Sequence, residues 1–162
     1  MKTVEELEKE INNVEETLNN LKTKVEELKK SKNGFEPTPK DWEPKLGEKY
    51  YFVNIGLKSC ETTFDDMSVD DVIIKYNRIF KTKEECQLYC DIKRAFREAS
   101  REFKYNSNNY YIWYDYLNKN MKYGCLFSNQ HKDIYFDSRE IIQNLIDKFG
   151  EENIKRYYLE VY

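Results

Sequence analysis

Residues 4–28 read VEELEKEINNVEETLNNLKTKVEEL, and this stretch decides how the chain is organised. Its apolar residues recur at alternating spacings of three and four without a break, which is the a/d pattern of an α-helical coiled coil. The eight residues of this apolar stripe are Val4, Leu7, Ile11, Val14, Leu18, Leu21, Val25 and Leu28. Glu or Lys at almost every flanking position favours a helical partner over packing on the chain's own body. The sequence therefore predicts a coiled-coil helix over residues 1–32.

Charge along this helix bears on the pairing of two copies. Residues 1–16 hold six Glu and two Lys, a net charge of −4, whereas residues 17–32 hold five Lys and two Glu, a net charge of +3. An antiparallel pair brings Glu10 of one copy to Lys24 of the other, and a parallel pair brings Glu10 to Glu15. Val or Ile at a with Leu at d is instead typical of parallel dimers. We expect a homodimer through this helix, with antiparallel pairing favoured.

Composition restricts the remaining possibilities. The chain has 162 residues, which suits one globular body beside the helix. Charged residues make up 35% of the chain but balance to a net charge of −3, so no basic stripe indicates nucleic-acid binding through phosphate contacts. No apolar run reaches the roughly 18 residues that indicate a membrane span, and a charged helix rather than a signal peptide follows Met1. We expect a soluble, intracellular protein with no membrane partner.

A proline-containing segment separates the helix from the rest of the chain. All three prolines lie in residues 33–44. Proline cannot continue a helix, and it also disfavours helical backbone at the residue before it. This segment is therefore predicted to be an extended, stiff linker, and residues 45–162 are predicted to form the body.

The body repeats one plan twice. Apolar and β-branched runs joined by turns predict a β-hairpin over residues 50–64, and a second over residues 110–127. Capping signals predict a helix from Thr82 to about Phe103, and another over residues 138–149 that ends at a glycine. Two ββ(β)α units follow, over about residues 48–103 and 109–150. The predicted fold class is α+β, with one antiparallel sheet and both helices on one face. The alternating pattern of residues 157–162 allows an added strand.

The residues that could carry chemistry are few and scattered. The four cysteines lack the paired spacing of a zinc site, and Cys86 and Cys90 stand four apart on a predicted helix, which favours core packing. The single histidine, His131, lies in a polar loop. Aspartates flank Met67 without the spacing of a calcium-binding loop, so capping is the preferred interpretation. We expect no catalytic residue, no metal and no cofactor, and hence no enzyme.

Three stretches of the body share a pattern with other proteins. The stretches beginning at Trp42, Asn77 and Ile134 read WEPKLGEKYYF, NRIFKTKEE and IYFDSREII. They resemble a group of small phage and prophage proteins that pair a short N-terminal coiled coil with a body opening W-x-P-K-x-G-E-x-Y-Y. The resemblance covers most of the chain and implies an accessory phage gene product in a bacterial cytoplasm. It implies no activity, because these motifs are structural.

Aromatic residues in the second hairpin are the candidate binding residues. Tyr111 and Trp113 alternate with residues of the opposite strand face, so one aromatic row points away from the helices if the sheet has a bare face. On a nearly neutral protein such a row is more often a protein interface than a base-stacking surface. We therefore expect a dimeric protein-binding module. In the phage context that the resemblance implies, its most specific form is an inhibitor of a host process such as an antiviral nuclease system. The alternative is a module that binds a small ligand or single-stranded nucleic acid.

Overall fold

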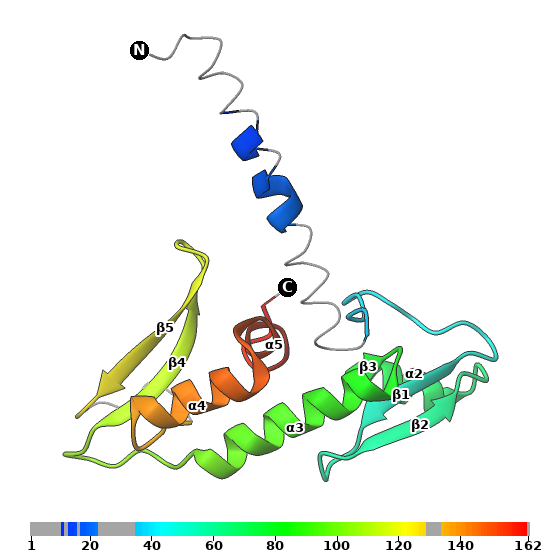
Figure 1. Ribbon diagram of the computed structural model, residues 1–162. Coiled ribbons are helices and arrows are strands. Elements are labelled where there is room, and N and C mark those ends of the chain that lie inside the picture. The colour runs from blue at the N-terminus through cyan, green and yellow to red at the C-terminus, as the bar shows by residue number, and fades with distance from the viewer. Residues whose placement is uncertain (1–10, 12, 16, 23–34, 129–133, 162) are drawn as a thin grey trace. The chain divides into compact units, whose positions relative to one another are not determined.

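The structure, a computed structural model, describes residues 11, 13–15, 17–22, 35–128 and 134–161 (Figure 1). The chain divides into two compact units, residues 1–37 and residues 38–162. In the first unit, residues 11, 13–15 and 17–22 are helical. Four residues of the apolar stripe lie there, and their side chains are 50–66% exposed in the single chain: Ile11, Val14, Leu18 and Leu21. The other four, Val4, Leu7, Val25 and Leu28, lie outside the described residues.

The described residues of the second unit, which we call the body, form two small antiparallel sheets and four helices. The first sheet has the strand order β2-β1-β3, and the second pairs β4 with β5. The strands are β1 (Lys49–Val53), β2 (Ser59–Thr63), β3 (Ile79–Phe80), β4 (Asn109–Asp115) and β5 (Asn120–Leu126). The helices are α2 (Ser68–Tyr76), α3 (Lys83–Ala99), α4 (Arg139–Phe149) and α5 (Glu151–Tyr157). The α+β class predicted from the sequence is confirmed.

Capping side chains fix where the two longer helices begin. The hydroxyl of Thr82 accepts a hydrogen bond from the backbone N–H of Glu85 at 3.2 Å, which starts α3. Ser138 does the same for the N–H of Ile141 at 3.3 Å, which starts α4. Gly150 has φ +82°, a backbone conformation that L side chains rarely adopt, and it separates α4 from α5. These three boundaries are those that the sequence predicts.

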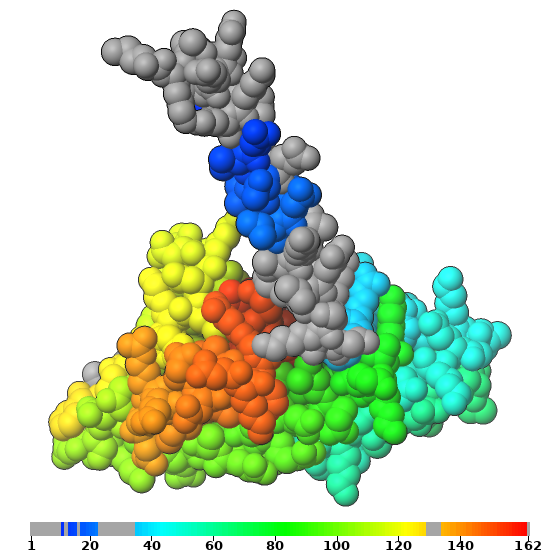
Figure 2. Space-filling view, in the orientation of Figure 1, coloured from blue at the N-terminus to red at the C-terminus, as the bar shows by residue number. Residues whose placement is uncertain are grey.

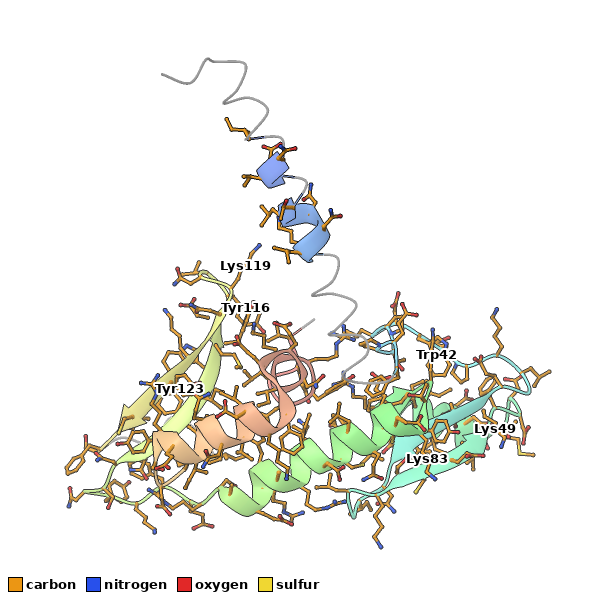
Figure 3. All side chains as sticks on the ribbon, viewed as in Figure 1. Trp42, Lys49, Lys83, Tyr116, Lys119 and Tyr123 are labelled. Carbon is orange, nitrogen blue, oxygen red and sulfur yellow. The ribbon has the colours of Figure 1, made fainter. Side chains whose placement is uncertain are left out.

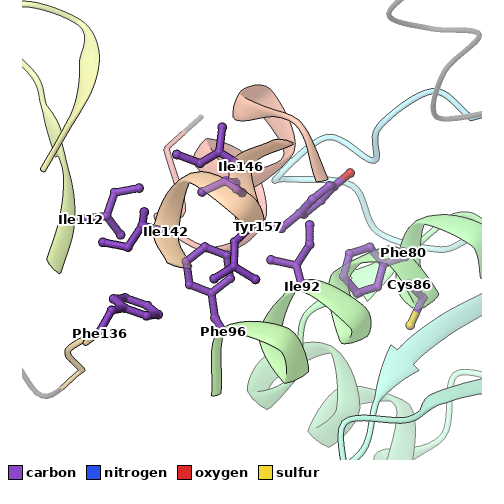
Figure 4. Close-up of a cluster of buried hydrophobic side chains, with 11 residues drawn as sticks. Phe80, Cys86, Ile92, Phe96, Ile112, Phe136, Ile142, Ile146 and Tyr157 are labelled. Atoms are coloured by element: carbon purple, nitrogen blue, oxygen red, sulfur yellow. The ribbon is translucent and has the colours of Figure 1, made fainter. Parts of the chain in front are cut away.

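The core lies between α3, α4, α5 and the sheets (Figure 4). Phe96 of α3 packs edge-on against Phe136, with ring centroids 5.9 Å apart, and stacks on Tyr158 at 3.8 Å. Ile92 on α3 and Ile142 on α4 are fully buried beside them. Burying several large apolar side chains in one cluster is the main stabilising contribution in a domain of this size.

The prediction of one shared sheet is wrong. β1 already has β2 on one edge and β3 on the other. One edge of β4 pairs with β5, and its other edge is used by a two-way hydrogen-bonded bridge between Tyr110 and Phe136. The two hairpins therefore belong to separate sheets, and the 17 residues of α3 lie between them along the chain.

Two further expectations differ from the structure. Tyr157, expected in a possible added strand, is the last residue of α5, and residues 158–161 form no strand. Thr38, expected in the linker, is buried in the body because its backbone N–H and hydroxyl donate to the carboxylate of Glu85. None of the described helices is long and apolar enough to cross a membrane.

Candidate functional site

The two faces of the β4–β5 hairpin have different surroundings. Residues of an antiparallel pair that lie opposite each other share a face, and successive residues alternate between faces. Tyr110 and Ile112 of β4, with Tyr123 of β5, contact the core. Tyr111 and Trp113 therefore lie on the opposite face, which we call the aromatic face. Figure 2 shows atoms of this hairpin, in yellow, at the surface of the body.

The two predicted binding residues form a stacked pair on this face. The rings of Tyr111 and Trp113 have centroids 5.2 Å apart and an interplanar angle of 27°. Tyr111 also makes an edge contact with Tyr135, which is fully buried, with ring centroids 6.3 Å apart. Phe103 packs on Tyr135 in turn, at 5.3 Å. The pair therefore rests on a buried aromatic support, which orients the rings before any partner binds.

A glycine opposite Tyr111 makes this arrangement possible. Gly124 on β5 pairs with Tyr111 across the hairpin. A Cβ atom placed on Gly124 would lie 2.3 Å from Cζ and 2.5 Å from the hydroxyl oxygen of Tyr111. The outer end of the tyrosine ring therefore lies directly over the backbone of Gly124, where only glycine leaves room for it.

One ion pair borders the aromatic face. Lys122, which lies opposite Trp113, forms an ion pair with Asp115 at the end of β4. Asp115 also accepts hydrogen bonds from the side chain of Asn118 at 2.7 Å and from the backbone N–H of Leu117 at 3.0 Å. The bonds from Asn118 and Lys122 lower the pKa of the Asp115 carboxyl well below its usual range. The carboxylate thus neutralises the lysine charge beside the stacked rings. Figure 3 labels Tyr116 and Lys119 at the turn of this hairpin.

A second candidate site lies beside Trp42. It is a cavity of about 580 Å³ lined by side chains that include Trp42, Arg78 and Tyr89. The guanidinium of Arg78 lies 5.3 Å from the ring centroid of Tyr89 and donates to the carbonyl oxygen of Arg156 at 3.4 Å. Both signs of charge line the cavity: Lys40 and Arg78 against Asp41, Glu43, Glu85 and Glu160. This mixture gives no preference for an anionic or a cationic ligand.

The other polar candidates have structural roles. Asp70 is buried and accepts hydrogen bonds from the hydroxyl of Tyr50 at 2.8 Å and from the backbone N–H of Asp65 at 3.0 Å, which agrees with the capping interpretation. Cys86 and Cys90 are buried and unbridged, and burial raises the pKa of the Cys86 thiol to about 12. Among the described residues, no group of three or more His, Cys, Asp or Glu could hold a metal ion. His131 lies outside the described residues.

Sequence reasoning placed Tyr111 and Trp113 on one face but missed the residues that support them. Tyr135 is distant in sequence, and nothing local connects it to β4. The position of Gly124 could have been recognised from the sequence, because a glycine inside a strand often marks a close approach by another group. Comparisons of this chain with protein-family models, with curated proteins and with solved structures find no match.

Proposed function

We propose that the chain is a dimeric protein-binding module that contacts its partner through the aromatic face. The observation that carries this proposal is the stacked pair of Tyr111 and Trp113, partly exposed and held in place by buried Tyr135. Tyr and Trp are the side chains most often found at energetic centres of protein interfaces, because they bury a large area with few rotatable bonds. A preoriented pair also loses little conformational entropy on binding.

The first unit supports the dimeric part of the proposal. The four described residues of the apolar stripe are at least half exposed in the single chain. A lone helix with an unburied stripe gains little stability from its own hydrogen bonds, whereas pairing removes the stripe from water. Two linked bodies would bind a repeated or dimeric partner more tightly than one body does, provided that both reach it.

Single-stranded nucleic acid is the second candidate ligand. Stacked aromatic rings on a sheet surface are also used to stack bases. Such sites add a positively charged groove for the phosphates, whereas Lys122 beside this pair is neutralised by Asp115 and the whole chain has a net charge of −3. Charge therefore favours a protein partner. In the phage setting that the sequence resembles, that partner would be a host protein whose activity the chain inhibits.

A comparison of two variants during gentle purification from bacterial cells tests the proposal. Trp113→Ala removes the outer ring and leaves Tyr111 over Tyr135, and Tyr76→Ala removes a 72% exposed ring from α2 as the matched control. We expect one protein to copurify with the wild type and with Tyr76→Ala, and its yield to fall at least tenfold with Trp113→Ala. Equal recovery with both variants, or recovery of nucleic acid in place of protein, contradicts the proposal.

A further inference from the structure

The outer edge of β5 has unused backbone hydrogen-bonding groups. Among the described residues, this seven-residue strand pairs with β4 and with no other strand. In Figure 1 it is the outermost strand of its sheet. On the second edge of β4, Tyr110 is bonded to Phe136, whereas the outer edge of β5 carries no such bridge among the described residues.

The hydrogen bonds of Tyr110 identify the groups that face outward. The N–H and C=O of Tyr110 bond to Phe136, at 3.1 and 2.8 Å, and so point away from β5. Because successive residues of an antiparallel strand point their backbone groups to opposite sides, those of Tyr111 point toward Gly124. The same alternation along β5 turns the N–H and C=O groups of Met121, Tyr123 and Cys125 outward. Three donors and three acceptors thus form one open row.

Features that usually block a strand edge are absent from β5. Its seven residues pair with β4 in one continuous register, so the described ladder contains no bulge, and the strand contains no proline. Its one charged side chain, Lys122, belongs to the aromatic face and is paired with Asp115. An open, regular edge of this length is a template for another extended chain.

We propose that the edge of β5 binds an extended segment of the partner protein, which adds a third strand to the β4–β5 sheet. This inference rests on the proposed function and specifies how the partner binds. The backbone of the partner segment would form hydrogen bonds with the outward groups of Met121, Tyr123 and Cys125. Alternate side chains of the segment would lie on the aromatic face, where the hydroxyl end of Tyr111 already extends over Gly124.

The same geometry specifies the composition of the segment. The side chain that passes Gly124 meets the end of the Tyr111 ring, which favours an aromatic or aliphatic residue at that position. The charge of Lys122, the one charged side chain of β5, is neutralised by Asp115, and Lys119 adds a cation at the turn. A neutral or acidic segment therefore suits this edge, and a lysine-rich segment does not.

Peptide selection on the full-length protein provides the test. The probe is a library of random seven-residue peptides displayed on phage, followed by synthesis of the selected sequences. Cys125→Pro removes one outward N–H and places a ring at the edge, whereas Cys125→Ser keeps the N–H and is the matched control. We expect selected peptides to bind the wild type and Cys125→Ser within twofold of each other, and Cys125→Pro at least tenfold more weakly. Equal binding to all three, or no selected peptide, overturns the proposal.

Two further measurements keep the test valid if Cys125→Pro perturbs folding. In the wild type, peptide binding should slow amide hydrogen exchange at Met121, Tyr123 and Cys125, while Lys122 and Gly124 are already slow because they bond to β4. Two versions of a selected peptide are N-methylated, each at one of the two alternating sets of amides. The version methylated at the amides that face β5 should lose binding, and the other version should keep it. Slowed exchange confined to other strands, or equal binding of both N-methylated peptides, overturns the edge proposal.

The outcomes separate the two proposals. If the partner is lost with Trp113→Ala but recovered in full with Cys125→Pro, the protein-binding function stands and the strand-addition inference fails. If peptides bind the edge while Trp113→Ala leaves partner recovery unchanged, the edge inference stands, and the proposal that the aromatic face contacts the partner fails. Light scattering compares the masses of the wild type and of Cys125→Pro. A dimeric wild type and a monomeric Cys125→Pro would show that the edge pairs with a second copy instead.

Discussion

Gly124 is the residue on which the geometry of the aromatic face depends. Gly124→Ala places a Cβ atom 2.3 Å from Cζ of Tyr111, so the ring must leave its place over β5 and its contact with Trp113 changes. We expect a loss of about 1–3 kcal/mol in the free energy of unfolding, the usual cost of overpacking, and a change in the near-ultraviolet circular dichroism of Trp113. Urea denaturation measures the first quantity. Gly56→Ala is the control, because its nearest contact would be an ordinary 3.4 Å. Similar losses for both variants would contradict this role.

A second single residue, Asp70, makes the free energy of unfolding depend on pH. Hydrogen bonds from the backbone N–H of Asp65 and from the hydroxyl of Tyr50 lower the pKa of Asp70 from its ordinary 3.8. A carboxyl with a lowered folded-state pKa contributes stability above the unfolded value, and this contribution is lost as the pH falls through the folded value. We expect the free energy of unfolding to fall below about pH 4, and to fall less steeply in Asp70→Asn. Parallel pH dependence of the two proteins, measured by urea denaturation, would contradict the prediction.

At the scale of elements, one contact joins the segment after the first unit to α3. The carboxylate of Glu85 is fully buried and accepts hydrogen bonds from Thr38 and, at 2.8 Å, from the hydroxyl of Tyr157 on α5. Thr38→Val keeps the shape and the backbone bond but removes the hydroxyl donor. We expect a loss of about 1–3 kcal/mol in the free energy of unfolding, measured by urea denaturation. Thr38→Ser, which keeps the hydroxyl, should lose clearly less. Equal losses would mean that the methyl group of Thr38 matters, and that the bonds its hydroxyl donates to Glu85 and accepts from the backbone N–H of Lys81 do not.

Elements with local signals were the predictable part of the fold. The hairpins, the caps at Thr82 and Ser138 and the break at Gly150 follow from residues that lie near one another in sequence. The separation into two sheets has no local signature, and neither does the bridge between Tyr110 and Phe136, which joins residues 26 positions apart. Strand alternation likewise placed Tyr111 and Trp113 on one face, but their support by Tyr135 required the tertiary structure.

At the scale of the whole molecule, the apolar stripe predicts that the protein is a dimer in solution. Leu18→Asp places a charge in the stripe, whereas Asn20→Asp adds the same charge off the stripe, at an exposed position two residues away. We expect light scattering to give twice the mass of one chain for the wild type and for Asn20→Asp, and the mass of one chain for Leu18→Asp. Far-ultraviolet circular dichroism checks that the body stays folded. A dimeric Leu18→Asp would place the main interface outside the stripe.

Site-specific crosslinking tests most directly whether the aromatic face contacts a protein. A photoreactive phenylalanine analogue replaces Trp113 in the full chain expressed in bacterial cells, and the same analogue at Tyr76 is the control. After illumination, we expect one protein to be joined covalently to the chain through position 113 and not through position 76. Crosslinks to nucleic acid, or no crosslink specific to position 113, would contradict the account.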